Sequence, residues 1–140
     1  MAPEFKAVDV KGKEYASADF KGKVMVLDFW FTGCIPCRAE MPYMEKLADD
    51  MQGENIVFIS MPVDTGDELM ALWRKMVKDK KGAELQLNVP GGFKSDLVKK
   101  YLIHGVPRIV IVDKEGKIVD ANAKRPSDPK LRMQLEQLVK

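Results

Sequence analysis

Apolar and polar residues alternate along this chain with two periods, one typical of β-strands and one typical of α-helices. Residues 24–30 (VMVLDFW) are nearly all apolar, as expected for a central strand covered on both faces. Alternation on either side of residues 11–13 (KGK) predicts an N-terminal hairpin, and residues 113–116 (DKEG) are a second hairpin turn signal. Further strands are expected at 5–10, 14–16, 56–61, 85–89, 108–112 and 117–121.

Two helices are predicted from apolar residues that recur at helical spacing after the central strand and at the C-terminus. The first begins near Ile35, and the last begins at Asp128-Pro129, since proline is favoured in a first turn. Strands that alternate with helices and end in a hairpin predict a three-layer α/β domain. The inward-facing residues are expected to be Met41, Met44, Leu47, Ala48 and Met51 in the first helix, and Leu131, Leu135 and Leu138 in the last.

Two further helices are predicted in the middle of the chain. Thr65 and Glu68 have the spacing of a capping box, and Gly82 marks the end of the helix that follows. The basic run at 78–81 (KDKK) is interpreted as the solvated end of this helix rather than a nucleic-acid site. Ser95 is the expected cap of the next helix. The inward-facing residues are expected to be Leu69, Leu72, Trp73 and Met76, and then Leu97, Val98, Tyr101 and Leu102.

Composition narrows the class of protein. The chain has 140 residues, of which 46% are hydrophobic, so residues 1–140 can form one domain with a real core. Its net charge of +2 is too balanced to indicate a nucleic-acid partner. No apolar run approaches the ~20 residues of a membrane span, and the N-terminal residues do not resemble a signal peptide. We expect a cytoplasmic protein, or a mature or trimmed form whose export segment or membrane tether lies outside this chain.

The only two cysteines, Cys34 and Cys37, follow the central strand directly and open the first helix. A disulfide between them would close so short a loop that it would contribute roughly 2 kcal/mol, against ~3 kcal/mol for fifteen residues. A zinc site needs four ligands, and beyond this pair the chain offers a single histidine, His104, besides carboxylates. A C-x-x-C pair between a strand and a helix favours redox chemistry, since the N-terminus of a helix stabilises a thiolate.

The sequence resembles the TlpA/ResA-like thiol-disulfide oxidoreductases of the bacterial cell envelope, which have the thioredoxin fold. The resemblance rests on "APEFKAVDVKGKEYASADFKGKVMVLDFW", "CIPC", "MPYMEKLADD" and "HGVPRIVIVDKEGKIV". It implies a central mixed sheet flanked by helices, with an N-terminal β-hairpin. Residues from about 65 to 89 match the inserted helix and strand of this branch.

The resemblance also implies roles for individual residues. Cys34 matches the nucleophile, which we expect to be exposed, and Cys37 matches the deeper resolving thiol. Asp28 matches a buried acid that takes up the proton of Cys37, although an acid bound to a structural partner stays an alternative. Pro107 matches the cis-proline that faces the cysteines, and Pro42 matches a structural kink in the helix.

Substrate contacts are expected beside these residues. The backbone of Val106 would be free to pair with an extended substrate strand. Gly33 stands where the family usually has tryptophan, so a large apolar contact beside the nucleophile is missing. Arg108 could attract an acidic partner, although a solvated strand end is the favoured interpretation, and His104 is expected to be an exposed loop residue. The substrate-binding residues expected from the resemblance are Trp30, Gly33, Ile35, Pro36, Val106 and Arg108.

We expect a reductase or exchange catalyst of protein disulfides that needs no cofactor and no metal. Ile35 offers neither charge nor hydrogen bond to the Cys34 thiolate, unlike the sites of strong oxidants. The expected partners are proteins that carry thiols or disulfides, together with an upstream thiol reductant. The family resemblance places such a protein in the bacterial periplasm or cell envelope, and makes the cytoplasm less favoured.

Three alternatives remain open. A peroxiredoxin-like thiol peroxidase shares the fold, but its P-x-x-x-T-x-x-C motif is missing, since Leu27 and Phe31 occupy the proline and threonine positions. A carrier of Cu(I) would use the same two thiolates. A redox-silent interaction domain is disfavoured because both cysteines are present.

Overall fold

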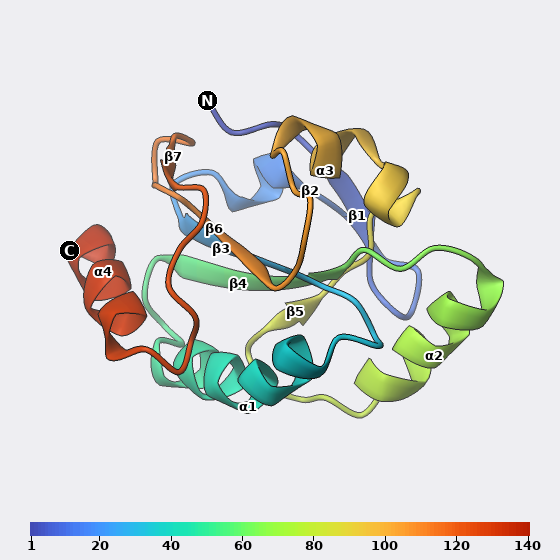
Figure 1. The fold of residues 1–140 in the computed structure, drawn as a ribbon. Coiled ribbons are helices and arrows are strands. Elements are labelled where there is room, and N and C mark those ends of the chain that lie inside the picture. Colours follow the sequence, from blue (N-terminus) through green and yellow to red (C-terminus); the bar gives the residue numbers. More distant parts are fainter.

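The structure is a computed structural model that describes residues 1–140, and Figure 1 shows its central sheet with helices packed around it. The sheet has five strands in the order β5-β4-β3-β6-β7. Strands β3, β4 and β5 are parallel, whereas β6 is antiparallel to β3 and β7 is antiparallel to β6. The predicted mixed sheet is therefore confirmed. The strands are β3 (Val24–Trp30), β4 (Ile56–Pro62), β5 (Leu85–Gln86), β6 (Arg108–Val112) and β7 (Ile118–Asp120).

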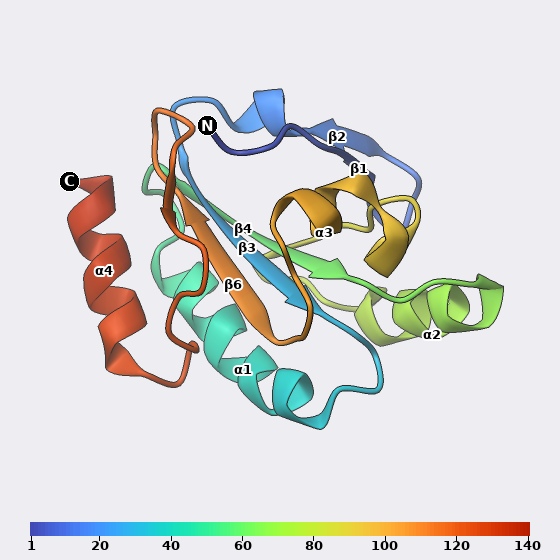
Figure 2. The same ribbon diagram turned by 45° about the horizontal axis from the view of Figure 1, so that its top comes forward.

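The remaining elements form a layer on each side of this sheet (Figure 2). Helices α1 (Ile35–Asp50) and α4 (Pro129–Val139) lie on one face. The other face is covered by helix α3 (Asp96–Lys100) and by the hairpin of β1 (Lys6–Val8) and β2 (Glu14–Ala16). The chain also contains helix α2 (Asp67–Val77) and two short 3₁₀ turns, η1 (Ser17–Phe20) and η2 (Gly92–Lys94).

The alternation of side chains along β3 separates two apolar clusters. Val24 and Val26 pack with Met44 and Leu47 of α1 on one face. Leu27 and Phe29 belong to the cluster on the opposite face, with residues of the hairpin and α3. A third cluster contains the two cysteines and lies where β3 ends and α1 begins. Its buried members are Trp30, Cys34, Cys37, Trp73 and Val77.

The inserted helix α2 differs from the expectation. Its N-cap is Gly66, with φ of 91°, and no side chain caps it, so the predicted capping box of Thr65 does not form. The helix ends at Val77, before the basic run and before Gly82. Only a narrow stripe faces inward, because Leu69 and Leu72 are 42% and 44% exposed.

The later elements follow the sequence signals more closely. The Ser95 hydroxyl accepts a hydrogen bond from the backbone N–H of Val98, as an N-cap should. Helix α3 stops at Lys100, so Leu102 lies beyond it with φ of 55° and is 67% exposed, contrary to its predicted burial. Asp128 caps α4 as predicted, and β5 is shorter than the predicted strand. None of these helices combines the length and apolar character that crossing a bilayer requires.

Candidate active site

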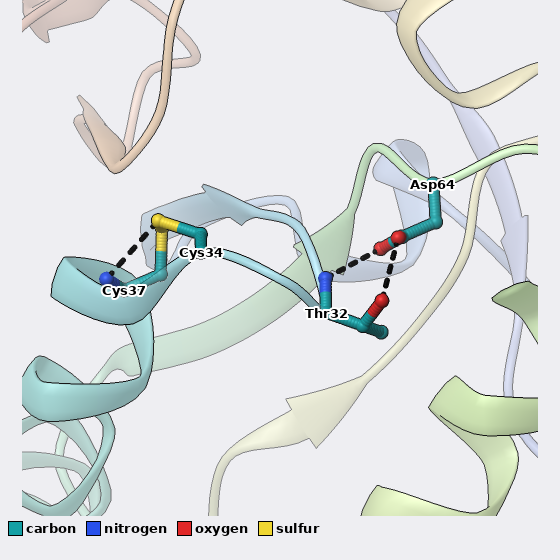
Figure 3. Close-up of a disulfide and its surroundings, with 4 residues drawn as sticks. All are labelled: Thr32, Cys34, Cys37 and Asp64. Carbon is teal, nitrogen blue, oxygen red and sulfur yellow. Dashed lines mark hydrogen bonds between the residues drawn. A yellow bond between two sulfur atoms is a disulfide. The ribbon is translucent and has the colours of Figure 1, made fainter.

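Cys34 and Cys37 form a disulfide at the N-terminus of α1, with their Cα atoms 5.2 Å apart (Figure 3). Cys34 is the N-cap residue of this helix, and the backbone N–H of Cys37 donates to its Sγ atom at 3.2 Å. The first N–H groups of a helix have no partner within the helix, so they can stabilise a negative charge on the capping sulfur. Pro36 fits this first turn because its missing N–H would have no intrahelical acceptor.

Both cysteines are buried in this oxidised form. Cys34 is 5% exposed and Cys37 is 3% exposed, so the expected exposure of Cys34 is wrong for the disulfide state. Gly33, Ile35 and Pro36 are exposed around them, as are Phe31 and Arg38, and these residues mark the side from which a substrate can approach.

Trp30 does not lie on this exposed side. It is 1% exposed and packs in the same cluster as the cysteines and Trp73. Its alternation along β3 turns it towards α1, into the interior. The predicted contact of Trp30 with a substrate is therefore wrong. Trp30 instead packs beside the disulfide from the interior.

Phe31 supplies the large apolar contact that Gly33 lacks. A Cβ atom on Gly33 would lie 3.3 Å from the Phe31 ring, which places the ring directly against this glycine. The Phe31 side chain is 36% exposed. The sequence prediction missed Phe31, because it considered only position 33 for this contact, whereas the aromatic residue stands two positions earlier, next to the strand.

The peptide bond between Val106 and Pro107 is cis, which confirms the prediction. Val106 is partly buried against the cluster that contains the cysteines. Its N–H and C=O take part in none of the backbone hydrogen bonds of the loops. Arg108 donates from Nε to the backbone oxygen of Ala121, which ties its side chain to the end of β7. His104 is exposed, as expected.

Asp28 lies on the α1 face of β3, between Val26 and Trp30. The side chain is half-buried, and burial, reinforced by the charge of Glu40, raises the pKa of Asp28 to about 7. The expected desolvation of Asp28 is confirmed. Glu40, one turn after Cys37, accepts hydrogen bonds from the N–H and hydroxyl of Ser127 at 2.9 and 2.8 Å. Its helical spacing from Cys37 is a signal that the sequence prediction did not use.

A second acid, Glu84, lies directly before β5. Burial, followed by the charge of Asp28, raises the pKa of Glu84 well above its usual range. No sequence pattern indicated this residue, because its position depends on which strand pairs with the edge of β4.

A buried hydrogen-bonded pair holds the turn that carries Cys34. The Asp64 carboxylate accepts from both the backbone N–H and the hydroxyl of Thr32 (Figure 3). Strands β3 and β4 are parallel, so the segments that follow them lie side by side at the same edge of the sheet. Neither residue was expected to contribute to the site.

Comparison with known proteins gives a consistent set of relatives. A family model described as the AhpC/TSA family matches residues 1–121. The thiol-disulfide oxidoreductase ResA of Bacillus thuringiensis subsp. konkukian is 31% identical over 118 residues, which are 84% of this chain and 65% of ResA. The chain thus spans somewhat less than two thirds of the length of this relative.

Two solved structures are similar over almost the whole chain. The thioredoxin domain of a thiol-disulfide oxidoreductase from Bacteroides vulgatus is 33% identical with a TM-score of 0.83, covering 99% of this chain and 95% of that one. An exposed lipoprotein thioredoxin from Streptococcus pneumoniae is 25% identical with a TM-score of 0.75, covering 97% of this chain and 100% of that one.

Proposed function

This chain belongs to the AhpC/TSA family of thioredoxin-fold proteins, and we propose that it is a thiol-disulfide oxidoreductase that acts through Cys34 and Cys37. The observation that carries the proposal is the disulfide at the first turn of α1, where the N–H of Cys37 donates to the Sγ of Cys34. An N–H group aimed at this sulfur favours its thiolate, which is the form that attacks a disulfide.

The exchange takes two steps. In the first, the Cys34 thiolate attacks one sulfur of a substrate disulfide, and the other substrate sulfur leaves as a thiolate. In the second, Cys37 loses its proton to the Asp28 carboxylate and attacks the Sγ of Cys34. The bond from Cys34 to the substrate breaks, its electron pair leaves on the substrate sulfur, and the protein is left with the Cys34–Cys37 disulfide. The substrate gains two electrons, and an upstream thiol reductant must return two electrons to the pair.

We infer that the substrate is a protein segment in an extended conformation. The backbone of Val106 has no partner among the loop hydrogen bonds and lies beside the cysteine cluster, so a substrate strand can pair with it. Phe31 at 36% and Ile35 at 80% exposure offer apolar contacts to such a segment. Gly33 and Pro36 add no polar side chain to the approach to the disulfide, whereas Arg108 is held at the end of β7.

The favoured direction of electron transfer is from the cysteine pair to the substrate, which is thereby reduced. Ile35 gives the Cys34 thiolate no extra charge or hydrogen bond, so the reduced form is less stabilised than in strongly oxidising relatives of this fold. The family relationship to ResA and the likeness to an exposed lipoprotein support a place in the bacterial cell envelope. A tether or export signal would then lie outside residues 1–140.

The test compares two reactions, reduction of a disulfide and reduction of hydrogen peroxide. The reduced protein is mixed with a disulfide-linked protein such as insulin and, separately, with hydrogen peroxide. We expect rapid loss of protein thiols only with the disulfide substrate, and no turnover of either substrate by Cys34→Ser. Catalytic consumption of peroxide at the same rate would instead favour the peroxidase. Equilibration with glutathione should give a reduction potential closer to about −270 mV than to about −120 mV.

A further inference from the structure

A groove of about 320 Å³ opens between α1 and the inserted helix α2, beside the end of α1 that carries the cysteines (Figure 2). Ligand sites commonly have volumes of about 300–1,000 Å³, so this groove is large enough to take up a side chain. Most of its lining residues recur at helical spacing on one face of α1, and the others come from α2 and the loop after it. They are Arg38, Met41, Pro42 and Glu45, and then Met76 and Lys80.

The apolar surface of the groove continues along both helices. On α1, Ile35 lies one turn before Arg38 and is 80% exposed. On α2, Leu72 lies one turn before Met76 and is 44% exposed. A single exposed leucine is ordinary, but apolar side chains that gather around a concave surface are typical of binding sites. Ile35 and Leu72 therefore enlarge the apolar part of the groove.

The groove adjoins the redox pair. Arg38 follows Cys37 directly, and Met41 lies one turn after Cys37 on α1. Met41 and Met76 both pack against the cluster that contains the two cysteines. Seven residues of helix span about 10 Å, so Met41 lies roughly this far along α1 from Cys34. An extended chain, at about 3.3 Å per residue, covers the same distance in about three residues.

The charges at the rim differ between the two ends of the groove. Glu45 and Lys80 form an ion pair at the end away from the cysteines, where their charges offset each other. Arg38, at the end next to the cysteines, is exposed and takes part in none of the ion pairs of the structure. A carboxylate that approaches the groove beside the disulfide therefore meets an unpaired positive charge.

We propose that this groove selects substrates of the exchange reaction by binding an apolar side chain of the substrate protein about three residues from the cysteine that Cys34 attacks, with an acidic neighbour of that side chain bound by Arg38. The inference rests on the proposed function and narrows its substrate class. The apolar side chain lies against Met41, Met76 and Leu72, and its removal from water stabilises the bound substrate. Binding energy of this kind raises the second-order rate constant of the first attack.

The first experiment uses short glycine-serine peptides with one cysteine, present as its mixed disulfide with 2-nitro-5-thiobenzoate, so that attack by Cys34 releases a coloured thiolate. The parent peptide has no leucine, and each of the others has one leucine placed two, three or four residues from the cysteine on either side. We expect the best leucine peptide to react about tenfold faster than the parent at low peptide concentration. A glutamate beside the leucine should add about threefold at low salt, and Arg38→Gln should lose this gain whereas Arg74→Gln, at an exposed position of α2, should keep it.

The ratio of the leucine rate to the parent rate is the readout for variants of the groove, because a loss of folded protein lowers both rates alike. Met76→Glu and Leu72→Glu should bring this ratio close to one. Met133→Glu is the matched control, since Met133 is exposed on α4, and it should keep the wild-type ratio. A ratio that stays near ten in both groove variants would overturn the inference, because the leucine would then bind elsewhere, for example at Phe31.

The second experiment does not depend on rates. Cys37→Ala is joined through Cys34 to the leucine peptide or to the parent peptide, and its methionine methyl groups, labelled with carbon-13, are followed by NMR. The signals of Met41 and Met76 should shift with the leucine peptide only, while that of Met133 should be the same with both peptides. Signals of Met41 and Met76 that do not distinguish the two peptides would overturn the inference.

These measurements separate the two proposals. If no peptide releases the coloured thiolate, the proposed function fails. If all peptides release it at the same rate, the exchange reaction stands and only the role of the groove fails. The role of the groove also fails if sedimentation shows a dimer of this chain that dissociates in Met76→Glu, since a second copy would then occupy the surface proposed for the substrate.

Discussion

The Asp64 carboxylate accepts two hydrogen bonds from one residue, at 2.9 Å from the backbone N–H of Thr32 and at 2.7 Å from its hydroxyl (Figure 3). Thr32 lies in the turn between β3 and α1, two residues before Cys34, whereas Asp64 follows β4. Thr32 and Asp64 are 2% and 7% exposed. The backbone N–H of Val63 also donates to the Trp30 oxygen at 2.7 Å. The turn that presents Cys34 is thus fixed to the neighbouring strand.

Asp64→Ala should destabilise the protein by about 2–6 kcal/mol, because it leaves two buried donors unpaired at about 1–3 kcal/mol each. Thr32→Val, which removes only the hydroxyl, should cost less than Asp64→Ala. Urea denaturation of the oxidised forms measures both free energies of unfolding. Equal losses in the two variants would contradict the assignment, since the backbone N–H of Thr32 keeps its partner only in Thr32→Val.

The two cysteines should behave differently when one of them is removed. Cys37→Ala leaves the Cys34 thiolate able to attack and leaves no thiol to resolve the product, so mixed disulfides with substrate proteins should accumulate. Cys34→Ala should trap almost nothing. Non-reducing gel electrophoresis after acid quenching measures both. Alkylation of the reduced wild type provides an independent check, since faster labelling of Cys37 than of Cys34 by iodoacetamide at pH 6 would reverse the roles.

The sequence predicted the elements whose signals are local. Strand β3 and the start of α1 have the predicted bounds, because an apolar run and the C-x-x-C turn are read within one short segment. Capping by Ser95 and Asp128 was also predictable, because each contact joins residues at most three apart. The first turn of α2 was not, since Gly66 takes the cap position with a backbone conformation that its neighbours do not reveal.

The parts of the site that the sequence missed depend on contacts between distant residues. Thr32 and Asp64 are 32 positions apart, and they meet only because β3 and β4 are adjacent and parallel. Glu84 precedes β5 and Asp28 belongs to β3, with β4 between them, so the effect of one charge on the other could be foreseen only from the strand order. The burial of Cys34 likewise depends on Trp73 of α2, which packs into the same cluster.

Gly92 should resist substitution because of the segment that carries Asp64. A Cβ atom on Gly92 would lie 2.4 Å from the backbone oxygen of Val63 and 2.5 Å from that of Asp64, at a residue with φ of 48°. Gly53→Ala is a matched control, since Gly53 also has a positive φ, of 94°, but has open space around it. We expect Gly92→Ala to lower the free energy of unfolding by about 1–3 kcal/mol more than Gly53→Ala, because only the former forces the packed backbone to move. Similar losses would show that the segment shifts at little cost.

Asp28 should make the stability of the protein fall as the pH rises. Its pKa is near 3.8 when the chain is unfolded and about 7 in the folded protein. Between these values the unfolded chain releases the proton and the folded protein keeps it, so a rising pH favours unfolding, and the effect is complete above pH 7. Asp28→Asn removes this penalty. Its free energy of unfolding should exceed that of the wild type by about 2–4 kcal/mol at pH 8 and by little at pH 4.

Urea denaturation of the oxidised proteins at pH 4, 6 and 8 measures this difference, and Asp50→Asn gives a control of opposite sign. Hydrogen bonds from Lys46 and Arg132 lower the pKa of Asp50, so its contribution to stability is present at neutral pH and is lost as the pH falls through its folded pKa. Asp50→Asn should therefore be less stable than the wild type at pH 8, and the two should converge in acid. A stability difference between Asp28→Asn and the wild type that stays constant from pH 4 to pH 8 would mean that folding does not shift the pKa of Asp28. It would remove the basis for its role as a proton acceptor tuned to neutral pH.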